Sequence, residues 1–197
     1  RFGVDPQTGN PLWYLNETGD ETTDNYNKAA KRYLGDANPS FYGAFTNNLN
    51  WKGFDFSFQL NYSFGRKIYG NHLRYDEQIG GSYGQNFTEY VYKNRWQKPG
   101  DITDVPRIEI GASYQVNDRY LIDASYFAIK NITLGYTLPK KWIHSIGLNN
   151  IRVFGSVDNL ALWSHLDGMD PQYNFSDGTD YAYAPNKTWT VGFEVKF

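Results

Sequence analysis

The chain has 197 residues, a formal net charge of −2 and no cysteine, and 18% of its residues are aromatic. The missing cysteines exclude disulfides and cysteine-based metal sites, and the near-zero charge gives no electrostatic basis for binding nucleic acid. No apolar run in the sequence approaches the ~18 residues that a membrane-spanning helix needs. A transmembrane β-strand needs only ~10 residues with every second one apolar, so the polar mean hydropathy of −0.65 does not exclude this class of membrane protein.

The first 40 residues are expected to form a loop, because turn-forming pairs recur in them, among them Asp5-Pro6 and Asn38-Pro39. One short helix is expected over Tyr26–Tyr33. The chain begins at Arg1, without an initiator Met or a signal peptide. We expect from this start that processing or truncation has removed an earlier part of the protein.

A β-hairpin is predicted over residues 41–64. From Phe54 to Phe64, six apolar residues alternate with five polar ones, which is the period of an extended strand. Residues 41–51 alternate as well, and Lys52-Gly53 between the two runs supplies a two-residue turn. The apolar side of the second strand is expected to be a lipid-facing stripe formed by Phe54, Phe56, Phe58, Leu60, Tyr62 and Phe64.

Three further strands are expected in the second half of the chain. The first covers about Tyr126–Leu138, and a slip of its alternation near Ile129-Lys130 indicates a β-bulge. The second covers about Ile151–Trp163. The third covers residues 188–197 and alternates without a break up to its final residue.

The connections between these strands are of two kinds. Residues 66–125 and 164–187 are expected to form long loops, whereas Lys52-Gly53 and the helical turn expected over Lys140–Asn150 are short. If Phe197 ends in the periplasm, both short connections fall on the periplasmic side and every long connection falls outside. Outer-membrane barrels have this asymmetry, and a soluble sandwich has no reason to sort its loops in this way.

Together these patterns predict an all-β fold that is incomplete within this chain. Five strands are an odd number and too few to close a bacterial barrel, which usually has an even number and at least about eight. A sheet edge left open in lipid would leave backbone groups without hydrogen bonds. We therefore expect residues 1–197 to be the C-terminal part of a larger transmembrane barrel. The alternatives are a soluble β-sandwich, such as a carbohydrate-binding module, and another porin-like or TonB-dependent barrel.

Six short stretches of the chain are informative when they are taken together. They are Leu34–Gly43 (LGDANPSFYG), Trp51–Phe58 (WKGFDFSF), Lys130–Pro139 (KNITLGYTLP), Asp158-Asn159-Leu160, Gly168–Pro171 (GMDP) and Gly192–Phe197 (GFEVKF). In the same order, they resemble segments of the SusC/RagA family, the TonB-dependent outer-membrane transporters of Bacteroidetes. One departure is Asp158, which stands where the family more commonly has Gln.

The resemblance implies the last five or so antiparallel strands of a transmembrane β-barrel of about 22 strands, with long extracellular loops. It places the plug domain, the TonB box and the earlier strands outside this chain. It implies import of oligosaccharides, other glycans or peptides across the outer membrane of a Gram-negative, Bacteroidetes-like bacterium. The implied partners are outer-membrane lipid, a SusD-like lipoprotein and TonB, which would act through the missing N-terminal region. No enzymatic activity, cofactor or nucleic-acid partner is expected.

Two further sets of residues are candidates for function. The alternating residues of the last strand resemble the signal by which the outer-membrane assembly machinery recognises its clients, and they are Trp189, Val191, Phe193, Val195 and Phe197. Aromatic residues in the long loops are candidate contacts for the ligand or the lipoprotein, because aromatic side chains often anchor interfaces. These are Trp13, Tyr14, Tyr90, Tyr92, Trp96, Trp163, Tyr173, Tyr181 and Tyr183, and the alternative is that they pack against each other.

Catalytic and metal chemistry have little support in the sequence. The three histidines, His72, His144 and His165, are far apart and lack the spacing of a metalloprotease or a catalytic triad. Two acidic clusters are calcium candidates, but neither has the spacing of an EF-hand, and a solvated loop is the simpler interpretation. They are Asp20, Glu21 and Asp24 in the first loop and Asp167, Asp170, Asp177 and Asp180 in the last.

Overall fold

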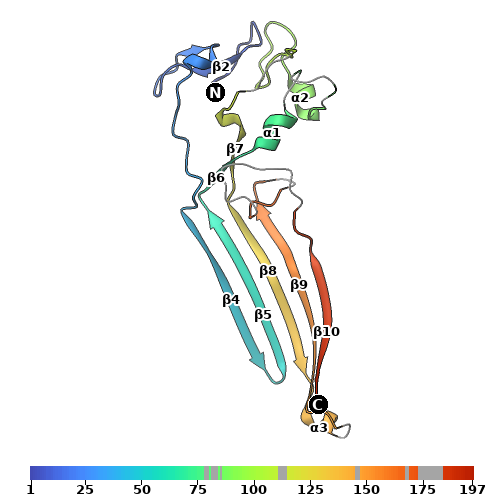
Figure 1. Ribbon diagram of the computed structural model, residues 1–197. Helices are drawn as coiled ribbons and strands as arrows, with labels where there is room; N and C mark the ends of the chain where they lie inside the picture. The colour runs from blue at the N-terminus through green and yellow to red at the C-terminus, as the bar shows by residue number, and fades with distance from the viewer. Residues whose placement is uncertain are drawn as a thin grey trace. The chain divides into compact units, whose positions relative to one another are not determined.

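The computed structural model describes residues 1–77, 80, 84, 86–110, 115–144, 147–166, 169–172 and 184–197 (Figure 1). The chain divides into two compact units, and each is described by itself. The sheet unit comprises Asp36–Lys67, Asp123–Phe175 and Ala182–Phe197, and the loop unit comprises Arg1–Gly35, Ile68–Ile122 and Ser176–Tyr181. Within these described ranges, no helix is long and apolar enough to cross a membrane.

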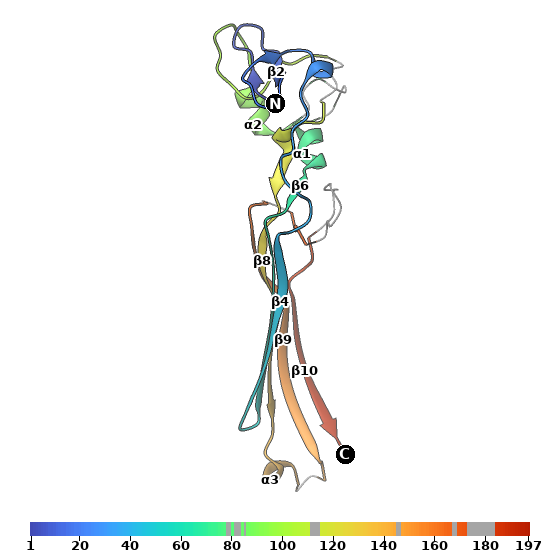
Figure 2. The same cartoon turned by 90° about the vertical axis from the view of Figure 1, so that its left-hand side faces the viewer.

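The sheet unit is built from five long antiparallel strands. They are β4 (Phe41–Trp51), β5 (Phe54–Phe64), β8 (Tyr126–Thr137), β9 (Asn150–Ser164) and β10 (Thr188–Lys196). Their order in the sheet is β10-β9-β8-β5-β4, so each strand pairs with the next of the five along the chain. Figure 2 shows this sheet from its β4 edge. All five predicted strands are confirmed, and each end differs from its prediction by no more than one residue.

The turn between β4 and β5 has the backbone that a two-residue hairpin needs. Lys52 has φ 47° and Gly53 has φ 89°, and positive φ at both central residues matches the twist of the flanking strands. Gly53 also lies against β8, because its carbonyl accepts a hydrogen bond from Thr137 N at 2.7 Å. A Cβ at Gly53 would lie 2.9 Å from Thr137 O, so the contact requires glycine. The turn thereby fixes β5 against both of its neighbours.

A bulge in β8 keeps the apolar residues of that strand on one side of the sheet. Against β5, the register shifts between Ile129 and Asn131, which leaves Lys130 without a counterpart. Ile129 and Ile132 are an odd number of positions apart, and without the extra residue they would lie on opposite faces. On β9, the two residues Asn159 and Leu160 lie opposite Lys130, and the φ of 52° at Asn159 is better tolerated by asparagine than by most residues. The slip predicted near Ile129-Lys130 is confirmed.

The connection from β8 to β9 contains a short helix, α3 (Lys140–Ile143), which begins directly after Pro139. The helical turn predicted over Lys140–Asn150 is therefore confirmed only for its first residues, since Asn150 already belongs to β9. Asn149 donates its N–H to Lys196 O at 2.8 Å. This bond ties the end of the connection to β10.

The first 35 residues, predicted to be a loop, contain a small three-stranded sheet. Its strands are β1 (Gly3–Val4), β2 (Pro11–Tyr14) and β3 (Thr22–Thr23), in the order β1-β2-β3. The prediction was wrong because such short strands cannot show an alternating pattern. The helix predicted over Tyr26–Tyr33 is wrong in extent, because the structure has one 3-10 turn, η1 (Tyr26–Lys28). After η1 the chain contacts β2, because Ala30 N donates a hydrogen bond to Tyr14 O at 2.8 Å.

Residues 66–125, predicted to be an irregular loop, also contain defined elements. They are β6 (Lys67–Tyr69), α1 (Asn71–Asp76), α2 (Glu89–Asn94), η2 (Asp118–Tyr120) and β7 (Leu121–Asp123), of which β6 and β7 pair. A small core forms where Val91 and Val105 are buried and packed against Phe87. Thr88 caps α2, because its hydroxyl accepts the N–H of Val91. These elements escaped prediction because each is shorter than the window over which periodicity can be measured.

Candidate functional site: a two-faced sheet and a loop groove

The register of the sheet unit brings most of the apolar residues of its strands to one face, the apolar face. A row across four strands consists of Phe58, Ile132, Val157 and Trp189, each opposite the next. Many side chains of this face are open to their surroundings, among them Val191, which is 83% exposed, and Phe193, which is 76% exposed. Asn47 on β4, opposite Phe58, is a polar exception. A continuous apolar surface this open is typical of a membrane or interaction surface.

The predicted lipid-facing stripe and the predicted assembly signal both lie on the apolar face. The stripe is the apolar side of β5, where Phe54, Phe56, Phe58, Leu60 and Tyr62 pair with apolar residues of β8. Phe64 ends the stripe opposite Phe41 of β4. The signal residues Trp189, Val191, Phe193 and Val195 lie on β10, and Phe197 follows the strand and is 89% exposed. Their contact with lipid and with the assembly machinery stays a prediction.

Aromatic rings lie at both ends of the apolar face, and also in its middle, where the ring centres of Phe45 and Phe58 lie 5.8 Å apart. At the end with the β4–β5 turn, the ring centres of Phe54 and Tyr136 lie 4.5 Å apart. At the opposite end, the ring centres of Phe127 and Trp163 lie 5.7 Å apart. Trp163 was predicted both to end a strand and to be a loop contact; it belongs to β9 and lies opposite Phe127 on the apolar face, so the loop placement was wrong and any ligand contact by it stays a prediction. Aromatic bands at both ends of an apolar face are characteristic of membrane barrels.

The opposite face of the sheet, the polar face, carries a charged row near the β4–β5 turn. Arg152 on β9 binds Asp55 on β5 through two hydrogen bonds, from Nε at 2.9 Å and from Nη2 at 2.5 Å. Its Nη1 donates to Glu194 on β10 at 3.2 Å. The row crosses β8 at Gly135, where a Cβ would lie 2.5 Å from Asp55 Oδ2 and 2.7 Å from Arg152 Nη2. Glycine at this position therefore allows the row to form.

Residues from two of the stretches singled out in the sequence contact each other at the bulge. Asn131 Nδ2 donates to Asp158 Oδ1 at 2.7 Å, and Lys130 Nζ donates to Asn159 Oδ1 at 2.6 Å. Asn159 Nδ2 in turn donates to Asn186 O at 3.1 Å, just before β10. These side chains hold the bulge in place and tie it to the start of β10.

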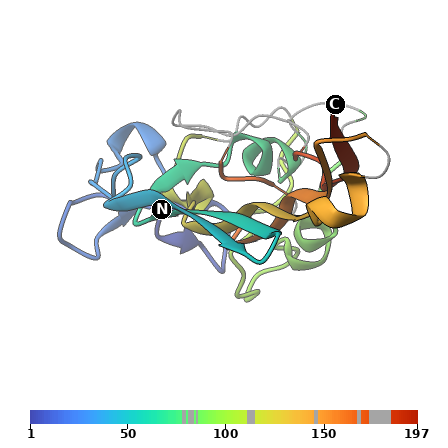
Figure 3. The same cartoon turned by 90° about the horizontal axis from the view of Figure 1, so that it is seen from below.

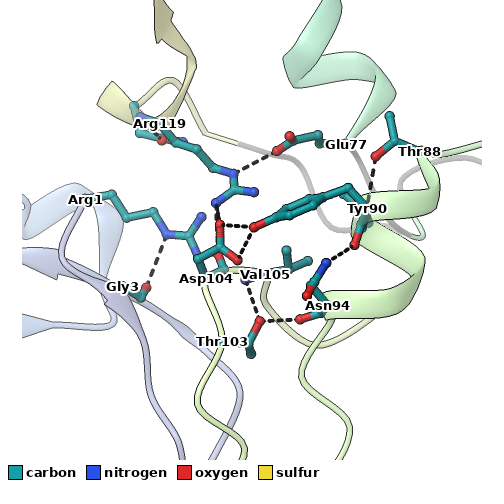
Figure 4. A network of polar contacts seen from close by, with 12 residues as sticks. Arg1, Gly3, Glu77, Thr88, Tyr90, Asn94, Thr103, Asp104, Val105 and Arg119 are labelled. Carbon is teal, nitrogen blue, oxygen red and sulfur yellow. Dashed lines mark hydrogen bonds and ion pairs between the residues drawn. The ribbon is translucent and has the colours of Figure 1, made fainter.

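The loop unit is held together by a charged network around Arg119 (Figure 4). Arg119 Nε donates to Glu77 Oε2 at 2.7 Å, and Nη1 donates to Asp104 Oδ2 at 2.5 Å. Tyr90 OH donates to the same Asp104 carboxylate at 2.9 Å. Glu77 follows α1, Tyr90 lies in α2 and Arg119 lies in η2, so the network joins segments that are far apart in the chain.

Burial and charge shift the pKa values within this network. Burial acts to raise the pKa of the Asp104 carboxyl, but the hydrogen bonds from Arg119 and Tyr90 outweigh burial and hold that pKa below its usual value. Burial, and then the neighbouring Asp104 carboxylate, raise the pKa of Tyr90. Burial also opposes the charge of Arg119, yet Asp104 and Glu77 raise its pKa above the usual value. At neutral pH the carboxylate and the guanidinium are charged, and Tyr90 keeps its proton.

A groove of about 780 Å³ lies within the loop unit. Its lining includes the rings of Trp13, Tyr14, Tyr26 and Tyr33, and the guanidinium of Arg32. Arg32 lies 3.8 Å from the centre of the Tyr14 ring, a cation–π contact. Tyr33 is 84% exposed, so one ring of the lining is open to a ligand. Such a lining suits ligands that combine flat apolar faces with polar groups.

Two of the predicted loop aromatics, Trp13 and Tyr14, line this groove. Trp13 offers a ligand little surface, because its ring is buried and packs edge-on against Tyr26 with the ring centres 5.1 Å apart. The strand β2 directs Trp13 inward, since neighbouring residues of a strand point to opposite sides. Three other predicted aromatics, Tyr173, Tyr181 and Tyr183, lie outside the described residues.

The remaining predicted aromatics of the loop unit pack within the unit. Tyr90 belongs to the charged network, and the Tyr92 ring stacks on that of Phe87 with centres 6.4 Å apart. Trp96 Nε1 donates to Pro6 O at 2.9 Å. Tyr90, Tyr92 and Trp96 therefore pack and form hydrogen bonds within the loops, which was the alternative to a ligand contact. Any ligand contact by them stays a prediction.

The acidic clusters give no metal geometry that the structure describes. Among the described residues, no three His, Cys, Asp or Glu side chains gather as metal ligands. Asp170 Oδ1 accepts hydrogen bonds from Gln172 N at 2.8 Å and from Gln172 Nε2 at 2.9 Å, within its own loop. The other members of that cluster, Asp167, Asp177 and Asp180, lie outside the described residues. A calcium site there stays a prediction.

Sequence reasoning missed the charged residues that organise both units. Arg152 and Asp55 are 97 positions apart, and Arg119 and Glu77 are 42 positions apart. One usable indication existed for the first pair, because both residues occupy polar positions near the strand ends that meet at the short connections. No comparable indication existed for the second pair, since nothing in an irregular segment fixes which residues meet.

No protein-family model matches the chain. The chain is similar to the TonB-dependent receptor P3 of Formosa agariphila, with 32% identity over 180 residues, or 86% of this chain and 17% of that protein. It is also similar to the TonB-dependent receptor SusC of Bacteroides thetaiotaomicron, with 26% identity over 200 residues, or 97% of this chain and 18% of that protein.

Among solved structures, the RagAB peptide importer in its open-open state superposes with a TM-score of 0.84 and 28% identity. The match covers 99% of this chain and 21% of that chain. The chain therefore spans about a fifth of the length of the relatives that it matches. Fold and sequence comparisons agree on the same group of proteins.

Replacing Asp104 with Asn is expected to loosen the loop unit around Arg119, because a neutral amide cannot replace the charge-assisted hydrogen bonds. We expect a cost of about 1 kcal/mol, below the range of roughly 1.5–3 kcal/mol for charged hydrogen bonds, because 51% of the Asp104 side chain is exposed. The measurement is hydrogen exchange at the Trp96 amide, which donates to Val105 O beside the network. Asp20→Asn, on an exposed part of the same unit, is the matched control.

The effect of Asp104→Asn should depend on pH. Because the folded-state pKa of Asp104 is lowered, its contribution is complete above the pKa of an unfolded aspartate and is lost as the pH falls through the folded value. The ratio of exchange rates between variant and wild type should therefore approach one in acid. A ratio that stays constant from neutral to acid pH would contradict a charge-based role.

Proposed function

Because the chain belongs to the SusC/RagA-like TonB-dependent receptors of the outer membrane, we propose that it forms part of the barrel wall of an active importer. The relatives are receptors and transporters, and no enzymatic step is assigned to this chain. The proposed cargo is an oligosaccharide or a peptide, and the RagAB neighbour is a peptide importer. A SusD-like lipoprotein and energisation by TonB, through a region outside this chain, complete the proposal.

The observation that carries the proposal is the exposed apolar face of the sheet unit. Residues such as Trp51, which is 67% exposed, and Val191, which is 83% exposed, would be a liability in water. A soluble sandwich would bury such a face under a second sheet. Within the described part of the sheet unit, no second sheet packs on it. Hydrocarbon chains of a bilayer are the surroundings in which this face needs no cover.

The polar face supports the assignment of a water-filled interior. β5 presents Asp55, Ser57, Gln59, Asn61 and Ser63 on this side, and the register continues the polar side onto β8 and β9. Charged groups there are paired across strands, as in the row formed by Asp55, Arg152 and Glu194. An interior of this kind admits hydrated ligands, whereas an apolar lining would exclude them.

The two edges of the sheet support a larger, closed barrel. β4 and β10 are its edge strands, and each presents a full row of backbone N–H and C=O groups on its outer side. In hydrocarbon such rows have to pair with further strands. We propose that the rest of the receptor supplies these strands, with the short connections facing the periplasm and the long connections facing outward. The groove in the loop unit is then a candidate contact for the cargo or the lipoprotein.

Import energised by TonB predicts uptake that depends on both the receptor and the proton-motive force. Cells that carry the intact receptor should take up a fluorescent oligosaccharide or a fluorescent peptide from a mixed pool, and cells that lack it should not. The class of ligand that disappears from the mixed pool is the cargo. Uptake that persists unchanged in the presence of a protonophore would instead support the passive, porin-like alternative.

The membrane placement predicts opposite outcomes for two neighbouring positions. Phe58→Arg puts a charge on the apolar face near the middle of β5 and is expected to cost about 2–4 kcal/mol of stability in a bilayer. Gln59→Arg, on the polar face, is the matched control and should cost far less. The measurement is the free energy of unfolding of the receptor in phospholipid vesicles. Equal costs at both positions, or a receptor that stays in the aqueous phase during detergent partitioning, would refute the lipid-facing assignment.

We also propose that the alternating residues of β10 and Phe197 act as the recognition signal for outer-membrane assembly. Phe197→Ala should lower the amount of receptor at the cell surface, because the exposed ring is then missing from the pattern. Lys196→Ala, on the polar side of the same strand, is the control. Surface labelling with a membrane-impermeant reagent measures the outcome, and wild-type levels of Phe197→Ala would argue against this role.

A further inference from the structure

The end of the sheet unit that carries the two short connections also gathers exposed lysines. Figure 3 looks along the strands from this end. Lys52 lies in the β4–β5 turn, and Lys140 and Lys141 begin α3. The β4–β5 turn contacts the end of β8, because Thr137 N donates to Gly53 O at 2.7 Å, and at most about 11 Å of chain leads from Thr137 to Lys140. We call Lys52, Lys140 and Lys141 the lysine rim.

The charge of the lysine rim is not neutralised by the acidic residues described at this end. Those residues, Asp55 and Glu194, both bind Arg152 on the polar face, at 2.5 Å and 3.2 Å. Among the residues that the structure describes, none of the three lysines forms an ion pair. The lysine rim is thus a local excess of positive charge on a chain whose net charge is −2.

The lysine rim adjoins aromatic residues at the end of the apolar face. Lys52 Nζ lies 4.9 Å from the centre of the Trp51 ring, and Trp51 lies opposite Phe54 on that face. Trp142, which follows Lys141 in α3, is 60% exposed. Tryptophan beside lysine is typical of the headgroup level of a bilayer, where the ring meets the acyl chains and the ammonium meets the phosphates. With the apolar face in lipid, the lysine rim lies at that level.

We propose that the lysine rim binds the headgroups of anionic phospholipids in the leaflet at this end of the barrel. This inference rests on the proposed function, because it requires the apolar face to contact acyl chains. The ligand is a phospholipid with a net negative phosphate headgroup, such as phosphatidylglycerol. A whole lipid fits better than a free anion, since the apolar face beside the lysine rim receives the acyl chains. In the orientation proposed above, the leaflet is the periplasmic one.

The test uses the intact receptor in phosphatidylcholine vesicles that contain a small fraction of spin-labelled lipid. Electron paramagnetic resonance measures the association of labelled phosphatidylglycerol relative to labelled phosphatidylcholine. The rim variant is K52Q/K140Q/K141Q. The control variant, K28Q/K98Q/K187Q, removes the same charge from exposed lysines outside the short connections. Wild type and control should favour phosphatidylglycerol about fivefold, and the rim variant should fall close to onefold.

The outcomes separate this inference from the proposed function. A rim variant that keeps the wild-type preference, or a control variant that loses it equally, overturns the inference and leaves the proposed function intact. A receptor that fails to float with vesicles in a density gradient overturns both. If circular dichroism shows that the triple variant has lost strand content, the single variants K140Q and K141Q replace it, and each should lower the preference. Unchanged preference in both single variants then counts against the lysine rim.

Discussion

The sheet unit depends on one constraint, the register of its antiparallel hydrogen-bond ladder. Side chains alternate with a period of two, so a slip of one residue would move a whole strand from one face to the other. The Lys52-Gly53 turn sets this register at one end of β5, and the extra residue Lys130 corrects it in the middle of β8. As a result, five strands from distant parts of the chain present one apolar and one polar face.

The two units use different interactions to achieve order. In the sheet unit the backbone ladder is sufficient, and charged side chains such as Arg152 adjust a framework that already exists. Among its described residues, the loop unit has a core of only a few buried apolar side chains, including those of Val91 and Val105. Charge-assisted hydrogen bonds around Arg119 and contacts between aromatic rings provide the stability that so small a core cannot provide. Each charged hydrogen bond contributes more to that stability than a neutral one. The groove forms within this second framework.

Elements with a long alternating sequence pattern were predicted correctly, and elements too short to show such a pattern were missed. The five strands have at least nine residues each, long enough for alternation to show both their extent and their faces. The bulge was also predictable, because it interrupts a pattern that is regular on either side of Ile129. Strands such as β1 and β3, with two residues each, leave no pattern to detect. Trp163 was placed both at the end of a predicted strand and among the loop aromatics for a related reason, since the end of a strand and the start of a loop look alike in sequence.

The amino-acid sequence was sufficient to define the strands, their two faces and the sorting of short and long connections, because alternation is a local consequence of extended backbone geometry. It was not sufficient to identify the partners of Arg152 and Arg119, the burial of Trp13 or the groove beside it. Those features join residues tens of positions apart, and such contacts depend on how the strands align and on the path of each loop. Only the folded chain sets that alignment and that path.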